Sequence, residues 1–428
     1  MSALLLVGLG EARAQSSVYR LSVDELFRLG TENSLRLKAA KMQEVLSSDR
    51  QKEARAGQLP HLEIGVNAGV IGQPIIFQQG LAHPMRPDAP DFSQNYHIEL
   101  TQPIYQGGKM RYTIRKADLQ KQIAFLNTAD GQAELKLALL QHYMNLFSYY
   151  KQQDVFARNI EESERRLKDI SRMKKEGLIT RNDEIRSELQ LTNDRLAYQE
   201  AENSIAITSQ QLDILLGLDE SLYILPDTAL LYRTVGLEEY EMYVQKAYEN
   251  YPGMQIARYN IRLAENDVRL TKANYLPTLS LRAGNTLARP VSTTLQDLYN
   301  NNWNIGLNLS YDLSSLYQNK PRMHEARQVV HLRHNAEEQL MQEIRIGVRG
   351  AYIRHKEALN RVEALKLSVK QAEENYRIVR NRYLNQLSIL TDLLDASSVR
   401  LEAELQLTVA RAQTVYTYYE LQRACGNL

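Results

Sequence analysis

The chain has 428 residues, enough for two or three ordinary globular domains, with 52 basic residues against 51 acidic residues. This charge balance gives no electrostatic basis for nucleic-acid binding, and no apolar run reaches the roughly 18 residues that a membrane-spanning helix needs. Cys425 is the single cysteine, which excludes a disulfide within the chain.

The N-terminus has the pattern of an export signal. A short apolar run at residues 3–10 precedes Ala12-Arg13-Ala14, which has the small-x-small pattern of a signal-peptidase site. We therefore expect residues 1–14 to be a signal peptide. No basic region precedes the apolar run, so either translation begins earlier or the signal is truncated. The alternative is a disordered hydrophobic start.

The rest of the chain repeats one unit, at residues 15–230 and 231–428. The clearest repeat is an apolar stripe with an alternating spacing of three and four residues, which is the seam of a coiled coil. In the second half it consists of Ile344, Val348, Ala351, His355, Ala358, Val362, Leu365, Val369, Ala372, Tyr376, Val379 and Tyr383. In the first half the same register holds Leu135, Leu139, His142, Leu146, Tyr149, Gln153, Phe156, Ile160, Ser163, Leu167, Ile170 and Lys174. A helix of about 60 residues is about 90 Å long, which predicts an elongated architecture.

Each half also contains two segments that alternate apolar and polar residues, which predicts strands at about 61–70, 95–104, 278–287 and 302–311. Their polar positions hold Gly, Asn, Ser, Glu and Arg, as in the water-filled lumen of a membrane barrel. Trp303 and Tyr311 bracket the last strand where interfacial aromatic residues belong. Because four strands cannot close a barrel, two or three copies are expected to assemble, and a wide lumen favours three.

Short motifs at the element boundaries carry a resemblance to a known family. Leu59-Pro60 and Leu276-Pro277 end helices before strands, and residues 102–108, Gln-Pro-Ile-Tyr-Gln-Gly-Gly, return the chain to helix. The turns between long helices read Gly177-Leu178-Ile179-Thr180 before Asp183, and Leu-Thr-Asp-Leu-Leu-Asp-Ala at 390–396. In their order and spacing these motifs resemble the TolC-like outer-membrane efflux proteins.

The resemblance implies a mainly α-helical fold with membrane β-strands. It implies a homotrimer in the outer membrane of a Gram-negative bacterium, with a 12-stranded β-barrel continuing into a helical periplasmic tunnel. The function implied is a passive exit duct for a tripartite efflux or type I secretion system. Its partners would be outer-membrane lipid, a periplasmic adaptor and an inner-membrane transporter of the RND or ABC type. No cofactor is implied, and the cargo stays open among drugs, metals and proteins.

By motif position, the resemblance places the gate of the tunnel at Asp183, Tyr383, Asp392 and Asp395. A ring of carboxylates around a three-fold axis can select cations or be bridged by basic groups. The alternative is that Asp183 and Asp392 only cap the return helices.

The resemblance also assigns the adaptor contact to the two tips, at Gly177, Leu178, Ile179, Thr180, Gln386, Leu387 and Ser388. The best-studied members of the family carry a basic latch residue where this chain has Ser388. Arg181, Arg186 and Arg382 are candidates to replace it.

Other chemistry has little support in the sequence. His331 and His334, with His324 nearby, lack the cysteine or carboxylate ligands that would complete a metal site. Phosphate loops and nucleophile elbows are absent from the sequence, so we expect no enzyme. The remaining alternative is an elongated coiled-coil scaffold or tethering protein without a pore, for which four alternating strands have no use.

Overall fold

The computed structural model describes residues 18–227, 236–291 and 296–428, which form two compact units. The sheet unit consists of Lys41–Leu126 and Ile256–Gln339, and the helical unit of Met1–Ala40, Asn127–Gln255 and Leu340–Leu428. Each unit therefore takes segments from both halves of the chain. The predicted signal peptide at 1–14 and the boundary between the repeats at 230/231 lie outside the described residues.

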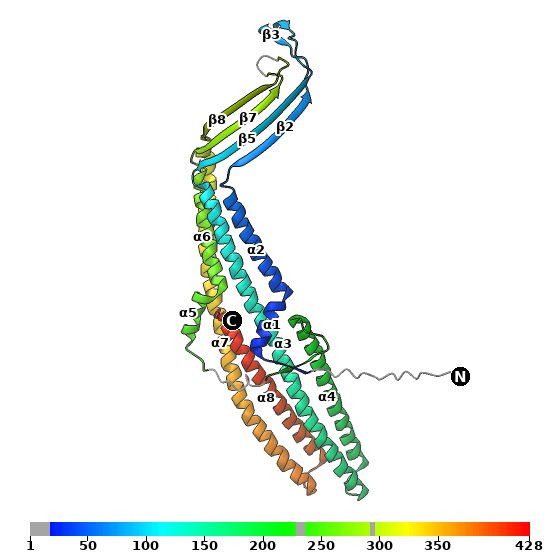
Figure 1. Ribbon diagram of the computed structural model, residues 1–428. Helices are drawn as coiled ribbons and strands as arrows, with labels where there is room; N and C mark the ends of the chain where they lie inside the picture. The colour runs from blue at the N-terminus through cyan, green and yellow to red at the C-terminus, as the bar shows by residue number, and fades with distance from the viewer. Residues whose placement is uncertain (1–17, 228–235, 292–295) are drawn as a thin grey trace, which may run out of the picture. The chain divides into compact units, whose positions relative to one another are not determined.

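Two very long helices dominate the chain, and each is followed by a return helix (Figure 1). They are α3 (Lys109–Lys175) with α4 (Arg181–Leu216), and α7 (Ser315–Leu384) with α8 (Leu390–Ala424). The shorter helices are α1 (Val23–Asn33), α2 (Leu35–Ala56), α5 (Tyr240–Asn250) and α6 (Pro252–Ala273).

The apolar stripes predicted as coiled-coil seams are inward-facing in the helical unit. Every residue of both stripes is buried or half-buried, and none is exposed. The stripe residues contribute to three buried clusters, for example through Leu139, Val348 and Tyr383. Their burial removes apolar surface from water along most of the paired helices, which stabilises the packing.

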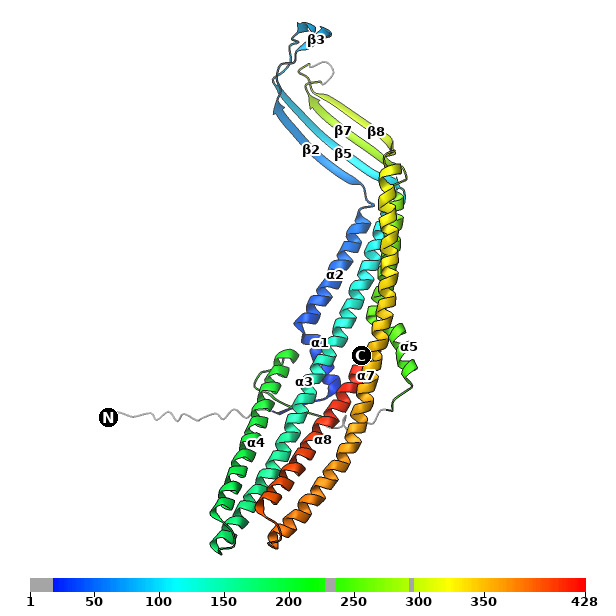
Figure 2. The same cartoon turned by 180° about the vertical axis from the view of Figure 1, so that it is seen from behind.

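The sheet unit holds a four-stranded antiparallel sheet in the order β2-β5-β7-β8 (Figure 2). Its strands are β2 (His61–Val70), β5 (Phe92–Gln106), β7 (Thr278–Arg289) and β8 (Asn300–Ser310). They coincide with the four strands expected from alternation, although β5 and β7 run further than predicted.

The strand register brings most of the apolar positions to one face of this sheet. Pairs such as Leu62 with Leu100 and Ala283 with Ile305 continue the face from strand to strand. Many of its side chains are exposed: Leu62, Ile64, Val66, Tyr96, Ile98, Leu287, Trp303, Ile305, Leu307 and Leu309. The opposite face is polar and is also exposed at Glu63, Glu99, Arg282, Asn304 and Asn308. The described part of the chain therefore covers neither face.

Four short strands were not expected from the sequence. β1 (Val18–Leu21) pairs in parallel with β6 (Tyr223–Pro226), and β3 (Ile76–Gln79) pairs with β4 (Ala82–Met85) between the strands predicted at 61–70 and 95–104. Segments of four residues are too short to show an alternating pattern. The parallel pair depends on a partner about 200 residues away, which no local pattern reveals.

Candidate functional site: the two hairpin tips

The helical unit contains both turns that join a long helix to its return helix. The first tip is residues 176–183, the turn after α3 with the first residues of α4, and the second tip is residues 385–395, the turn after α7 with the first residues of α8. They lie side by side in both views of the helical unit (Figures 1 and 2). Arg186 on α4 donates a hydrogen bond to the Thr391 hydroxyl on α8 at 2.9 Å, which links the two hairpins.

The first tip begins with a glycine turn and ends in a capping box. Gly177 has a φ of 76°, a conformation that favours glycine, and its amide donates to the Lys174 carbonyl. The Thr180 hydroxyl accepts from the Asp183 amide at 3.3 Å, and the Asp183 carboxylate accepts from the Thr180 amide at 3.1 Å. Asp183 therefore caps α4, and this contact by itself does not decide between a cap and a gate.

Glu184 is a largely buried carboxylate that connects the end of α3 to the start of α4 in the first tip. Its side chain is 11% exposed and accepts hydrogen bonds from Ser171 at 3.0 Å, Lys174 and Arg181. The Lys174 ammonium, followed by Arg181 and Ser171, outweighs burial and lowers the pKa of Glu184 to about 2. Glu184 was not among the residues predicted from the sequence, although its place beside the predicted cap, ten residues from Lys174, was a usable signal.

The second tip has the same form with fewer polar contacts. Gln386 occupies the left-handed turn position with a φ of 60°. The N-cap residue Ile389 has no side-chain hydrogen bond. Asp392 accepts from the Ser388 hydroxyl at 2.7 Å and from the Ile389 amide at 3.4 Å. Asp395, by contrast, is exposed and makes no hydrogen bond or ion pair with another described residue.

An apolar cluster supports the second tip. Ile170 of α3 packs there with Tyr383, Leu390 and Leu393, and Leu393 is only 2% exposed. Burial raises the pKa of Tyr383, and the negative charge of Asp183 raises it further. Of the predicted gate residues, Tyr383 is therefore influenced by the charge of Asp183, whereas Asp392 accepts hydrogen bonds within its own turn.

The three arginines considered as substitutes for the latch have different partners. Arg181 binds Glu184 in its own hairpin, and Arg382 donates to the Leu387 carbonyl in its own turn at 3.3 Å. Only Arg186 reaches from one hairpin to the other.

A charged contact among α3, α7 and α8 was also not predicted from the sequence. Arg400 on α8 binds Glu162 on α3 and lies over the Tyr376 ring, 4.1 Å from its centroid. Burial raises the pKa of Glu162, but hydrogen bonds from Arg400 and then Tyr376 outweigh it and hold that pKa below its ordinary value. This contact ties α3 to both helices of the second hairpin.

No group of three or more His, Cys, Asp or Glu suited to a metal ion occurs among the described residues. Within that same part of the chain, no helix combines the length and hydrophobicity needed to cross a bilayer.

The chain is similar to a known protein family and to several solved structures. Residues 243–427 match the family described as outer membrane efflux protein. Among solved structures, VceC from Vibrio cholerae is similar with a TM-score of 0.78 and 16% identity, covering 94% of this chain and 96% of that chain. The Campylobacter jejuni CmeC outer membrane channel is similar with a TM-score of 0.76 and 16% identity, covering 95% and 85%. The open state of the Neisseria gonorrhoeae MtrE outer membrane channel gives 0.74 and 16%, covering 94% and 88%. No curated protein sequence matches the chain.

Proposed function

We propose that the chain is an outer membrane efflux protein, because residues 243–427 match the family of that description, and that it forms the outer-membrane exit duct of a tripartite efflux or secretion system. It conducts substrates passively and is not an enzyme. The observation that carries the proposal is the sheet of β2, β5, β7 and β8, which has one apolar and one polar face, both exposed.

A lipid bilayer explains the apolar face. Trp303 and Leu309 at opposite ends of β8 are 71% and 70% exposed, and a continuous apolar face of this kind is rare on a soluble monomer. A strand of about ten residues crosses the hydrocarbon layer when it is tilted. The polar face then lines a water-filled lumen. A coiled-coil scaffold without a pore would have no need of such a sheet.

The edges of this sheet argue for a homotrimer. β2 and β8 each pair on one side only within the described residues. An open edge in lipid leaves backbone groups without partners at a cost of several kcal/mol each. Three copies pair β2 of one chain with β8 of the next and give a closed 12-stranded barrel.

The helical tips are the periplasmic end of the duct in this proposal. Asp183, Tyr383, Asp392 and Asp395 form the gate, and Arg186 takes the place of the basic latch at Ser388. The adaptor contact is made by Gly177, Leu178, Ile179, Thr180, Gln386, Leu387 and Ser388. The exposed side chains of Leu178 and Leu387, and of the neighbouring Ile389, offer it apolar contacts. An RND or ABC transporter in the inner membrane supplies the energy.

Substitution of Asp395 tests the gate separately from the caps: of the three predicted gate aspartates, Asp183 and Asp392 accept hydrogen bonds at helix starts, whereas the Asp395 side chain makes no hydrogen bond with another described residue. In planar bilayers we expect Asp395→Ala to weaken cation preference and block by trivalent cations added from the periplasmic side, without loosening α8. The Glu200→Ala/Glu202→Ala variant, which removes exposed carboxylates from α4, is the matched control. Unchanged block in a folded Asp395→Ala trimer would reject the carboxylate ring, and a stable monomer without conductance would reject the duct.

A further inference from the structure

Arg166 on α3 is a buried arginine with an unused donor. The residue is 8% exposed, and its Nη2 donates to the Ser163 hydroxyl at 2.7 Å. Its Nη1 has no hydrogen-bond partner among the described residues. A buried guanidinium with an unsatisfied donor is unfavourable, so a ligand that accepts this hydrogen bond would be bound with a gain in stability.

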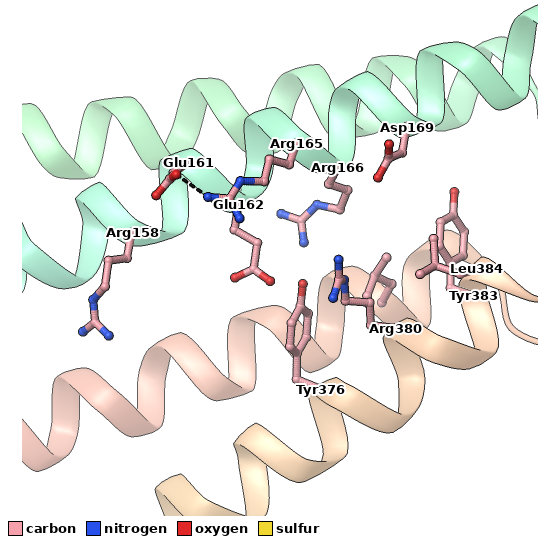
Figure 3. Close-up of a pocket in the computed structure, with 11 residues that line it drawn as sticks. Arg158, Glu161, Glu162, Arg165, Arg166, Asp169, Tyr376, Arg380, Tyr383 and Leu384 are labelled. Carbon is pink, nitrogen blue, oxygen red and sulfur yellow. Dashed lines mark hydrogen bonds and ion pairs between the residues drawn. The ribbon is translucent and has the colours of Figure 1, made fainter.

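The Tyr383 hydroxyl on α7 is a second buried polar group whose hydrogen-bonding capacity is unused among the described residues. Tyr383 is 6% exposed, and its hydroxyl has no partner in the described part of the chain. Tyr383 and Arg166 line one cavity of about 360 Å³ between α3 and the second hairpin, and Arg380 of α7 lines it as well. Figure 3 shows Arg166 entering this space from α3, with Arg380 and Tyr383 entering from the opposite side.

The three acidic residues that line the cavity form their ion pairs with basic groups other than Arg166 and Arg380, although the positive charge of Arg166 also helps to lower the pKa of Glu162. Each has a different basic neighbour within ion-pair distance: Glu161 with Arg165, Glu162 with Arg400, and Asp169 with Arg172. Neither Arg166 nor Arg380 makes an ion pair with a described residue. Two guanidinium groups thus face one cavity without a counter-ion of their own, which favours an anion between them.

We propose that this cavity binds a small oxyanion, such as phosphate, sulfate or a free carboxylate, between Arg166, Arg380 and the Tyr383 hydroxyl. All three groups are hydrogen-bond donors, and a guanidinium can donate two parallel hydrogen bonds to an oxyanion. The donors belong to helices from different halves of the chain. The anion therefore connects α3 to α7 a few residues above the second tip.

This position gives the anion a regulatory role, which rests on the proposed function of the chain as a duct. In the proposed duct, opening of a gate at the tips moves the second hairpin relative to α3. A bound oxyanion adds hydrogen bonds to the arrangement described here and so favours it over an opened one. Phosphate or sulfate should then lower the conductance of the duct relative to chloride at equal ionic strength.

Titration calorimetry on the detergent-purified full chain tests the site directly, with inorganic phosphate, sulfate and acetate as probes and chloride as reference. We expect saturable binding of no more than one oxyanion per chain. Tyr383→Phe keeps the buried ring and removes only the hydroxyl, so it should weaken binding several-fold. Arg380→Gln lies at an exposed position and should fold normally while weakening binding about tenfold, as the loss of a charge-assisted hydrogen bond predicts.

Arg377→Gln is the matched control, because Arg377 is an exposed arginine on the same helix that pairs with Glu374 outside the cavity. It should leave the affinity unchanged. Absence of saturable binding to the wild-type chain, as expected if water or an acidic side chain of another protein fills the cavity, would overturn the site. Equal weakening by Arg377→Gln would do the same. Calorimetry needs no pore, so a chain that binds phosphate but conducts no ions would reject the duct and leave the oxyanion site intact.

Discussion

The two hairpin tips have nearly the same backbone course but are stabilised by different interactions. In the first tip, Thr180 and Asp183 form a complete capping box and Glu184 accepts from three side chains. The second tip has an isoleucine at the N-cap and depends on the buried side chains of Tyr383 and Leu393. The two tips therefore resemble each other in sequence and backbone course but differ in the interactions that stabilise them. They should respond differently to pH and to substitution.

The largest expected effect is the loss of apolar packing in the second tip. Leu393→Ala removes a side chain that is 2% exposed and should destabilise the start of α8 by about 2–5 kcal/mol. Leu178→Ala in the first tip, where the side chain is 51% exposed, should cost no more than about 0.5 kcal/mol. Hydrogen exchange of the amides in α8 and α4 measures both local stabilities. Similar losses in the two variants would show that the second tip has no buried apolar support.

Acid should loosen the first tip through Glu184. Its pKa in the folded protein, about 2, is below the ordinary value of 4.5, so the stabilisation is complete above pH 4.5 and is lost as the pH falls toward 2. Limited proteolysis with an acid-stable protease, from pH 5 to pH 2.5, should reveal increasing cleavage at residues 176–180. Glu184→Gln should be cleaved readily across this range with little further dependence on pH. Wild-type acid sensitivity retained in Glu184→Gln would contradict this assignment.

The smallest effects should come from exchanging the caps. Thr180→Ala removes the N-cap hydroxyl of α4 and should cost about 1 kcal/mol in local stability. Ile389→Thr supplies a hydroxyl at an extended N-cap position, with φ of −88° and ψ of 163°, and should stabilise the start of α8 by about the same amount. Hydrogen exchange in the first turn of each helix follows both changes. A loss of protection in Ile389→Thr would mean that Ile389 contributes packing that outweighs a cap.

Much of the fold could be predicted because the signals are periodic and local. The 3–4 spacing of the stripe from Ile344 to Tyr383 identified the face of α7 that is now buried or half-buried. Alternation in β2 and β8 placed each strand within two residues of its observed bounds. Glycine and hydroxyl residues at 177–180 marked the first tip. The membrane location of the sheet and the gating roles of Asp183, Tyr383, Asp392 and Asp395 stay predictions.

The sequence by itself determined the long helices, the four strands of the large sheet, which of their faces are apolar and where the hairpins turn, because each of these depends on neighbours a few residues apart. Only the tertiary structure decided that Arg186 reaches Thr391, that Glu184 is enclosed by three donors, and that Arg166 and Tyr383 face one cavity. Most of these contacts join residues of helices from different halves of the chain. Such contacts depend on how complete helices pack against each other, and no local spacing records that.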